Sequence, residues 1–152
     1  MTRHGADDPF APFVPRRGRR TALGFTVGSL VVFGVLALAL PATGYRGWSV
    51  GDSLLIAGFG VLMALVMWRF AAIRALPSRE GIVVRNVAVT RRLTWGEIES
   101  VRFAGGDAWA WLDLTDGDQL AVMAIQRSDG ARALAEASRL AALVQALGSE
   151  RR

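Results

Sequence analysis

The stretch that decides the fold is TALGFTVGSLVVFGVLALAL, residues 21–40, which contains no charged side chain. As an α-helix it would be about 30 Å long, which is the thickness of the hydrocarbon core of a bilayer. A run of arginines stands directly before it and Pro41 directly after it. The sequence therefore predicts a first membrane-spanning helix over residues 21–40.

A second apolar segment follows shortly afterwards, and we predict a second spanning helix over residues 49–73. Trp48 and Trp68 bracket it at a helical separation of about 30 Å, again one hydrocarbon thickness. Tryptophan favours the headgroup level, and the long arginine side chain can reach water from a span end. We therefore expect Trp48, Trp68 and Arg69 to be interfacial anchors. Tyr45 is expected near the outer boundary.

The distribution of arginine predicts the orientation of the two spans. Residues 1–20 carry five arginines, and three more follow the second span, but the loop 41–53 carries only one. Because cytoplasmic flanks are enriched in basic residues, both termini are predicted to lie in the cytoplasm of a bacterial cell. The alternative is a cleaved signal peptide over the first span. The long apolar core and the second span that follows at once disfavour it.

Small residues recur at helical spacing within both spans. Gly24 and Gly28 form a GxxxG pattern, and Gly60 with Ala64 forms a similar pair. Such faces let two helices approach closely. The pairing could join the two spans to each other, or two copies of the protein in a homodimer through Gly24 and Gly28.

Composition excludes several functional classes. The chain has no cysteine and one histidine, so it lacks the usual ligands of a metal cluster and the usual nucleophile–base pairs. Its net charge of +5 resides in the flanks of the spans, because residues 81–152 hold nine arginines and nine acidic residues. Nucleic-acid binding needs a basic face on the binding domain. We therefore predict no enzyme activity, no cofactor, no metal and no nucleic-acid partner.

The segments outside the spans fall into three parts. Residues 1–20 mix three prolines with charges and are predicted to be a disordered basic tail. Residues 74–80, with Pro77, are predicted to be a linker. Residues 81–148 are predicted to be a small cytoplasmic domain.

Alternating apolar residues predict five short antiparallel strands in this domain, over residues 81–85, 90–95, 98–103, 109–114 and 119–124. Asp116-Gly117 is a hairpin signal between the last two. A helix should follow, with Ser128 as N-cap and Gly148 as C-cap. Its apolar face is predicted to comprise Leu134, Ala137, Ala141, Val144 and Leu147. The fold class is therefore α+β.

Two runs of this domain resemble a known family. They are GIVVRN, residues 81–86, and RRLTWGEIESV, residues 91–101. They are similar to the bacterial pleckstrin-homology-like (PH-like) domains, above all to the short form in small actinobacterial membrane proteins with two spans. The resemblance covers roughly residues 78–147. It implies an antiparallel sheet or half-barrel closed by the C-terminal helix. A full PH fold has seven strands, two more than we predict.

The resemblance also suggests where a ligand could bind. Eukaryotic PH domains bind phosphoinositides through basic residues of the first strands, which makes candidate headgroup contacts of Arg85, Arg91, Arg92 and Arg102. A second candidate surface comes from the residues themselves, because Trp109 and Trp111 share one face of a predicted strand. Exposed aromatic pairs mark partner surfaces, whereas Trp95 is expected in the core.

Three functions follow as hypotheses. The first is a membrane-anchored interaction module that recruits or stabilises a membrane or envelope protein, without catalysis. The second is a regulator that binds anionic lipid headgroups through arginines. The third is an accessory subunit of a membrane transporter.

Overall fold

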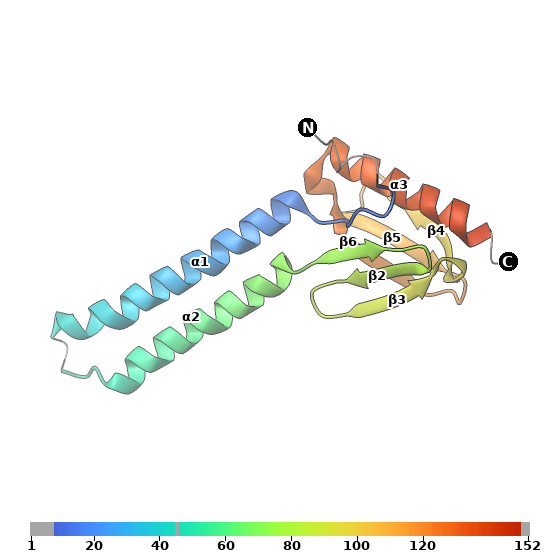
Figure 1. Ribbon diagram of the computed structural model, residues 1–152. Coiled ribbons are helices and arrows are strands. Elements are labelled where there is room, and N and C mark those ends of the chain that lie inside the picture. Colours follow the sequence, from blue (N-terminus) through green and yellow to red (C-terminus); the bar gives the residue numbers. More distant parts are fainter. Residues whose placement is uncertain (1–7, 45, 150–152) are drawn as a thin grey trace. The chain divides into compact units, whose positions relative to one another are not determined.

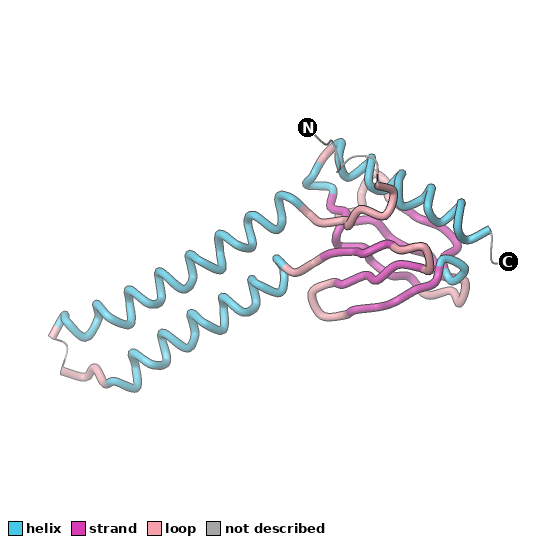
Figure 2. The backbone as a smooth tube through the Cα atoms, viewed as in Figure 1, coloured by secondary structure: helices cyan, strands magenta, loops and turns pink. Residues whose placement is uncertain are grey.

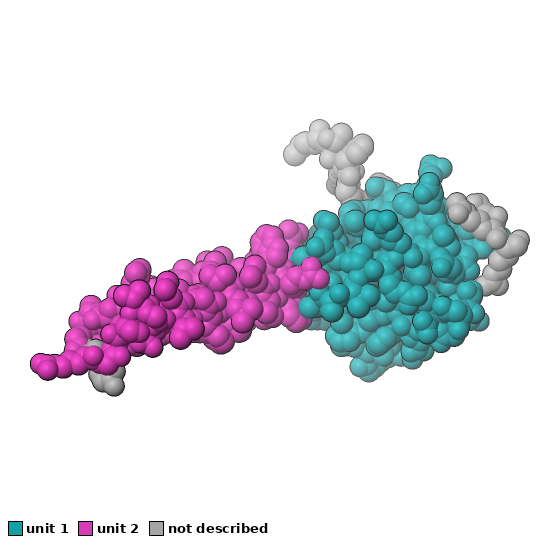
Figure 3. All heavy atoms as spheres, turned by 90° about the horizontal axis from the view of Figure 1, so that it is seen from below, with its two compact units in different colours: residues 1–18, 72–152 teal, residues 19–71 magenta. Residues whose placement is uncertain are grey.

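The computed structural model describes residues 8–44 and 46–149, so the predictions for residues 1–7 and Tyr45 lie outside it. The chain forms two compact units (Figure 3). One comprises residues 19–71, and the other joins the residues up to 18 with those from 72 onward. The second unit is thus assembled from both flanks of the first.

The first unit is a pair of apolar helices (Figure 1). Helix α1 spans Arg16–Ala39 and continues as the 3-10 turn η1, Leu40–Thr43, and helix α2 spans Val50–Ala71. Both helices are long and apolar enough to cross a membrane, as predicted. Helix α1 begins at Arg16, five residues before the predicted start, and its first turn therefore contains basic residues.

Residues Ser29, Phe33 and Gly60 hold the two helices together. The Ser29 hydroxyl donates a hydrogen bond to the Gly60 carbonyl oxygen at 3.1 Å. A Cβ at Gly60 would collide with the Phe33 side chain, so only glycine allows this approach. Phe33 also packs edge-on against Phe59 with ring centroids 5.1 Å apart. The pair of small residues Gly60 and Ala64 is therefore used inside the hairpin.

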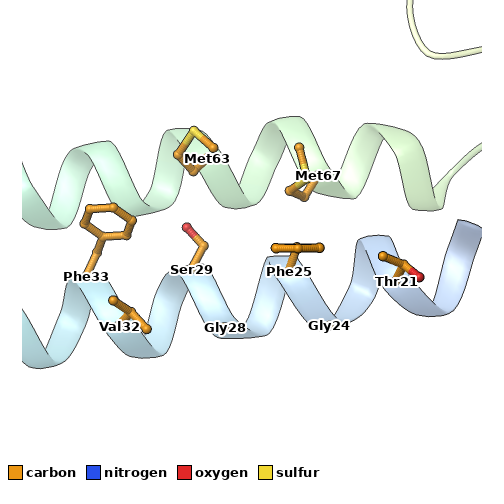
Figure 4. A pocket seen from close by; sticks show the side chains of 9 residues that line it. All are labelled: Thr21, Gly24, Phe25, Gly28, Ser29, Val32, Phe33, Met63 and Met67. Atoms are coloured by element: carbon orange, nitrogen blue, oxygen red, sulfur yellow. The ribbon is translucent and has the colours of Figure 1, made fainter.

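The other small pair, Gly24 and Gly28, does not pack against α2. Gly24 and Gly28 have no neighbouring atom within 4 Å of an added Cβ, and they line an apolar groove of about 550 Å³. Figure 4 shows Met63 and Met67 of α2 across this groove from Phe25, Ser29 and Phe33 of α1. The homodimer through Gly24 and Gly28 stays a prediction.

The second unit contains two three-stranded antiparallel sheets (Figure 2). The first has the order β1-β2-β3, with the strands Arg74–Pro77, Gly81–Arg85 and Thr90–Thr94. The second has the order β4-β5-β6, with the strands Ile98–Arg102, Trp109–Leu114 and Gln119–Gln126. Helix α3, Ala131–Gly148, follows. This arrangement confirms the predicted α+β class.

Asn86 joins the two sheets. Its side-chain amide donates to the Ala121 carbonyl oxygen at 2.7 Å and accepts from the Met123 amide at 3.2 Å. The Asn86 side chain thereby makes, between the end of β2 and β6, the kind of hydrogen bonds that a neighbouring strand's backbone would make. The sequence predicted only a turn at this position.

The predicted linker 74–80 is wrong, because its first half is strand β1. Ala75 and Pro77 are buried and pair with Val84 and Ile82 of β2. The strand has only four residues, and its small buried side chains give a weak alternation signal. The domain therefore has six strands rather than the predicted five.

The prediction of disorder over residues 1–20 is wrong for the described part of that segment. Residues 8–15, the N-terminal strap, pack on the domain. Phe13 is fully buried in the core, and it exchanges backbone hydrogen bonds of 2.9 and 3.0 Å with Ala75 of β1. The three prolines favour an extended chain here rather than a disordered one.

Arg139 of α3 fastens the strap. Its Nη1 donates to the carbonyl oxygens of Asp8, Pro9 and Ala11 at 3.4, 3.1 and 2.8 Å. Its guanidinium lies 3.9 Å from the centroid of the Phe13 ring. One turn away, burial raises the pKa of the Glu136 carboxyl in spite of its ion pair with Arg132.

Trp95 lies in the core between the sheets and α3, as predicted. It is fully buried, and its Nε1 donates to the Ser78 carbonyl oxygen at 2.9 Å. It opens the 3-10 turn η2, Trp95–Glu97, which Thr94 and Glu97 close as a capping box. Hydrogen bonds from the Thr94 amide and hydroxyl hold the pKa of Glu97 below its usual value.

Both predicted caps of the C-terminal helix are wrong. Residues Arg127–Asp129 form a separate 3-10 turn, η3, and α3 begins after Gly130, whose φ is 64°. Ser128 therefore lies outside the helix. At the other end Gly148 is a helical residue, where a Cβ would lie 3.2 Å from the Trp95 carbonyl oxygen. The absence of a side chain at Gly148 therefore lets α3 pack closely against the Trp95 backbone, and Gly148 does not form a turn.

The buried face of α3 is also rotated from the prediction. Leu134 is 58% exposed, whereas Leu140 and Leu143 are buried. Ala137 and Val144 are buried as predicted, and Leu147 packs partly against the core. The buried residues Ala133, Ala137, Leu140 and Val144 recur at spacings of three and four, and Leu134 lies beside this stripe.

Candidate interaction surface

Strand β5 carries the candidate aromatic surface. Its residues alternate, with Ala110, Leu112 and Leu114 buried and Trp109, Trp111 and Asp113 half-exposed. The two tryptophans therefore lie on the outer face of the second sheet, away from the core. We call Trp109 and Trp111 the Trp surface.

The two indoles form one patch. Their ring centroids are 6.4 Å apart and their planes are inclined by 51°. The Trp109 Nε1 is buried and has no hydrogen-bond partner among the described residues. Buried indole N–H groups usually have an acceptor, and leaving one unpaired costs free energy. The patch therefore offers apolar ring area to a partner, while the unpaired Trp109 donor lies below the surface.

Polar groups frame the Trp surface and are themselves satisfied. Trp111 lies between Arg102 of β4 and Ala121 of β6 in the register. Arg102 pairs with Asp113 at 3.7 Å, and Asp113 also accepts from Ser100 at 2.8 Å and Gln119 at 2.9 Å. An aromatic centre within a polar rim is the usual anatomy of a protein interface.

The end of β6 and the loop before Trp109 lie next to the Trp surface. Trp109 pairs with Gln126, and the Arg127 side chain donates to the carbonyl oxygens of Ala104 and Asp107. Arg127 also lies over the Phe103 ring, 4.9 Å from its centroid. These contacts fix the loop before Trp109. Sequence reasoning missed them because they join residues that are about twenty positions apart.

The structure does not bring the four candidate headgroup arginines together. Arg91 pairs with Asp118 at 3.6 Å, and Arg102 pairs with Asp113 on the other sheet. Arg91 stands opposite the buried Val84, whereas Arg92 stands opposite the half-exposed Val83. Only Arg85 and Arg92 therefore share a face.

The predicted interfacial anchors lie at the two ends of α2. The Trp48 indole donates to the Ser53 hydroxyl at 2.9 Å just before the helix begins. Trp68 is 56% exposed near the other end, and Arg69 is in the last turn. Their place in a bilayer stays a prediction. Over residues 8–44 and 46–149, no three His, Cys, Asp or Glu side chains gather as metal ligands.

Comparison with known proteins gives two findings. The profile of the family described as "Bacterial PH domain" matches residues 78–142. Uncharacterised proteins from Mycobacterium bovis and from two strains of Mycobacterium tuberculosis are each 33% identical over 114 residues, or 75% of this chain and 73% of the relative. No solved structure matches. Strand β1 and the N-terminal strap lie outside residues 78–142, which the family profile matches.

Proposed function

Because this chain belongs to the bacterial PH domain family, we propose that it is a membrane-anchored interaction module that recruits or stabilises another membrane or envelope protein. The domain binds its partner through the Trp surface. The hairpin supplies the anchor, so even a weak contact suffices, because tethering raises the effective concentration of both proteins.

One observation carries this proposal, namely the half-exposed aromatic pair of Trp109 and Trp111 on the outer face of β5. A partner with an apolar surface would cover both rings. Tryptophan is enriched among residues that dominate binding energy. The nearby charges are already paired within the domain, so apolar contact rather than net charge drives the association.

The N-terminal strap supports a cytoplasmic location for both flanks. Phe13 precedes α1 and Ala75 follows α2, yet the two pair within one core. Both therefore fold in the same compartment, and the arginine-rich flanks favour the inside of the cell for it. Cleavage after the first span would remove Phe13 from the core, and this supports an uncleaved first span.

The test is a crosslinking pull-down from native membranes that compares the natural chain with the Trp109→Ala/Trp111→Ala variant. We expect the variant to lose a reproducible partner, because truncating a central aromatic residue commonly costs 2 kcal/mol or more, about 30-fold in affinity. The matched control is Leu134→Ala, which removes a large side chain that is 58% exposed on α3. A partner profile that is unchanged by the double substitution, or empty for the natural chain, would contradict the proposal.

A further inference from the structure

Positive charge is concentrated in the first sheet, although residues 81–152 together carry no net charge. Strands β1, β2 and β3 together contain four arginines and no acidic residue. The acidic residues lie in the second sheet, the turns and α3. The first sheet is therefore strongly basic, although the domain as a whole is not.

The register gathers three of these arginines on one face. Arg74 pairs directly with Arg85, which places their Cβ atoms about 5 Å apart. Arg92 pairs with Val83, two residues before Arg85 on the same face, so it is a diagonal neighbour at about 7–8 Å. We call Arg74, Arg85 and Arg92 the arginine triad. Arg91 is on the opposite face.

The charge of the arginine triad is not compensated by the described residues of the domain. No member forms an ion pair with a described residue, whereas Arg91 and Arg102 each have an acidic partner. Like charges directly opposite each other destabilise a sheet. An anion bound between them would relieve this repulsion, and guanidinium groups suit phosphate oxygens because they bind them in a bidentate manner.

The position of the triad in the chain selects the source of phosphate. Arg74 follows Ala71, the last residue of α2, by three residues, so the two lie within about 11 Å even in a fully extended chain. A triad tied so closely to a span end stays near lipid headgroups. We propose that the arginine triad binds the phosphate groups of anionic phospholipids and so docks the first sheet on the inner leaflet.

This inference is independent of the Trp surface, which lies on the other sheet. It also changes the residues that the sequence suggested, because Arg74 joins the set and the paired Arg91 and Arg102 leave it. Lipid docking by the first sheet would leave the second sheet available for a protein partner. The two proposals can therefore fail separately.

The experiment uses the full chain in lipid nanodiscs with a single reporter. Because the chain contains no cysteine, Ala88→Cys in the exposed turn after Arg85 accepts an environment-sensitive fluorophore at one position. We expect the reporter to contact lipid in discs of phosphatidylcholine mixed with phosphatidylglycerol, and less so in phosphatidylcholine alone. The contact should weaken as salt is raised.

Two matched double variants decide the outcome, since each removes two positive charges. Arg85→Gln/Arg92→Gln should lower the ratio of docked to undocked domain roughly 30-fold, at about fivefold per arginine. Arg91→Gln/Arg102→Gln should leave it close to that of the natural chain. An equal loss in both variants, or no response to phosphatidylglycerol, would overturn the proposal. So would an equal response to inorganic phosphate or an acidic peptide in discs of phosphatidylcholine alone.

Discussion

Phe13→Ala is expected to lower the free energy of unfolding of the domain by about 3–5 kcal/mol, the usual cost of truncating a buried phenylalanine. Phe13 is among the largest fully buried side chains of the chain. Its loss also removes the ring on which the Arg139 guanidinium rests and weakens the hold on the strap. A domain of this size is stable by only about 5–15 kcal/mol, so a large part of its stability depends on a residue that precedes α1.

The measurement is thermal and denaturant unfolding of the full chain in detergent micelles, followed by protease resistance of the domain. Val89→Ala is the matched control, because Val89 is 51% exposed in the turn between β2 and β3. That control should change stability by about 0.5 kcal/mol or less. If Phe13→Ala were as mild as Val89→Ala, the strap would not be part of the core.

Gly81→Ala should lower the free energy of unfolding of the same domain by about 1–3 kcal/mol, which is the usual cost of inserting atoms into a packed core. Gly81 is buried in β2 opposite Thr94, and an added Cβ would collide with the Leu93 carbonyl oxygen. That oxygen belongs to the backbone and cannot move aside as a side chain could. The pairing of β2 with β3 would have to open.

Gly96→Ala is the control for this prediction, because a Cβ at Gly96 has no neighbour within 4 Å. Both substitutions change glycine to alanine within one small domain, so they share their effect on the unfolded chain. Unfolding midpoints of the two variants should differ clearly. Equal midpoints would mean that β2 and β3 are not paired in this register.

Hydropathy and periodicity along the chain were enough to predict two apolar helices of membrane-spanning length and the outward face of β5. The two apolar helices follow from hydropathy over about twenty residues, and Trp109 and Trp111 follow from strict alternation. Trp95, at the end of a predicted strand, was also predicted in the core. These features depend on near neighbours in sequence, which a single sequence displays directly.

The missed features all depend on which distant segments meet. The strap pairs Phe13 with Ala75 across two spans, and short segments of this kind give little periodic signal. The arginine candidates were chosen by sequence position, but the register decides which of them share a face. Ser128 was predicted as an N-cap because it precedes a helical pattern, but it lies in η3, outside the helix. The neighbouring Asp129 accepts hydrogen bonds from the distant Arg16 and Arg17 amides.

The central claim is that both flanks of the hairpin form one domain, and a disulfide tests it most directly. Phe13 and Ala75 exchange both backbone hydrogen bonds, so Pro12 lies opposite Leu76 with Cα atoms about 4.5 Å apart. That separation suits a disulfide. The Pro12→Cys/Leu76→Cys variant is oxidised in native membranes, and Pro12→Cys/Thr43→Cys, with Thr43 after α1, is the control. We predict a disulfide in the first pair and none in the second; its absence in the first, with both thiols still reactive, would contradict the account.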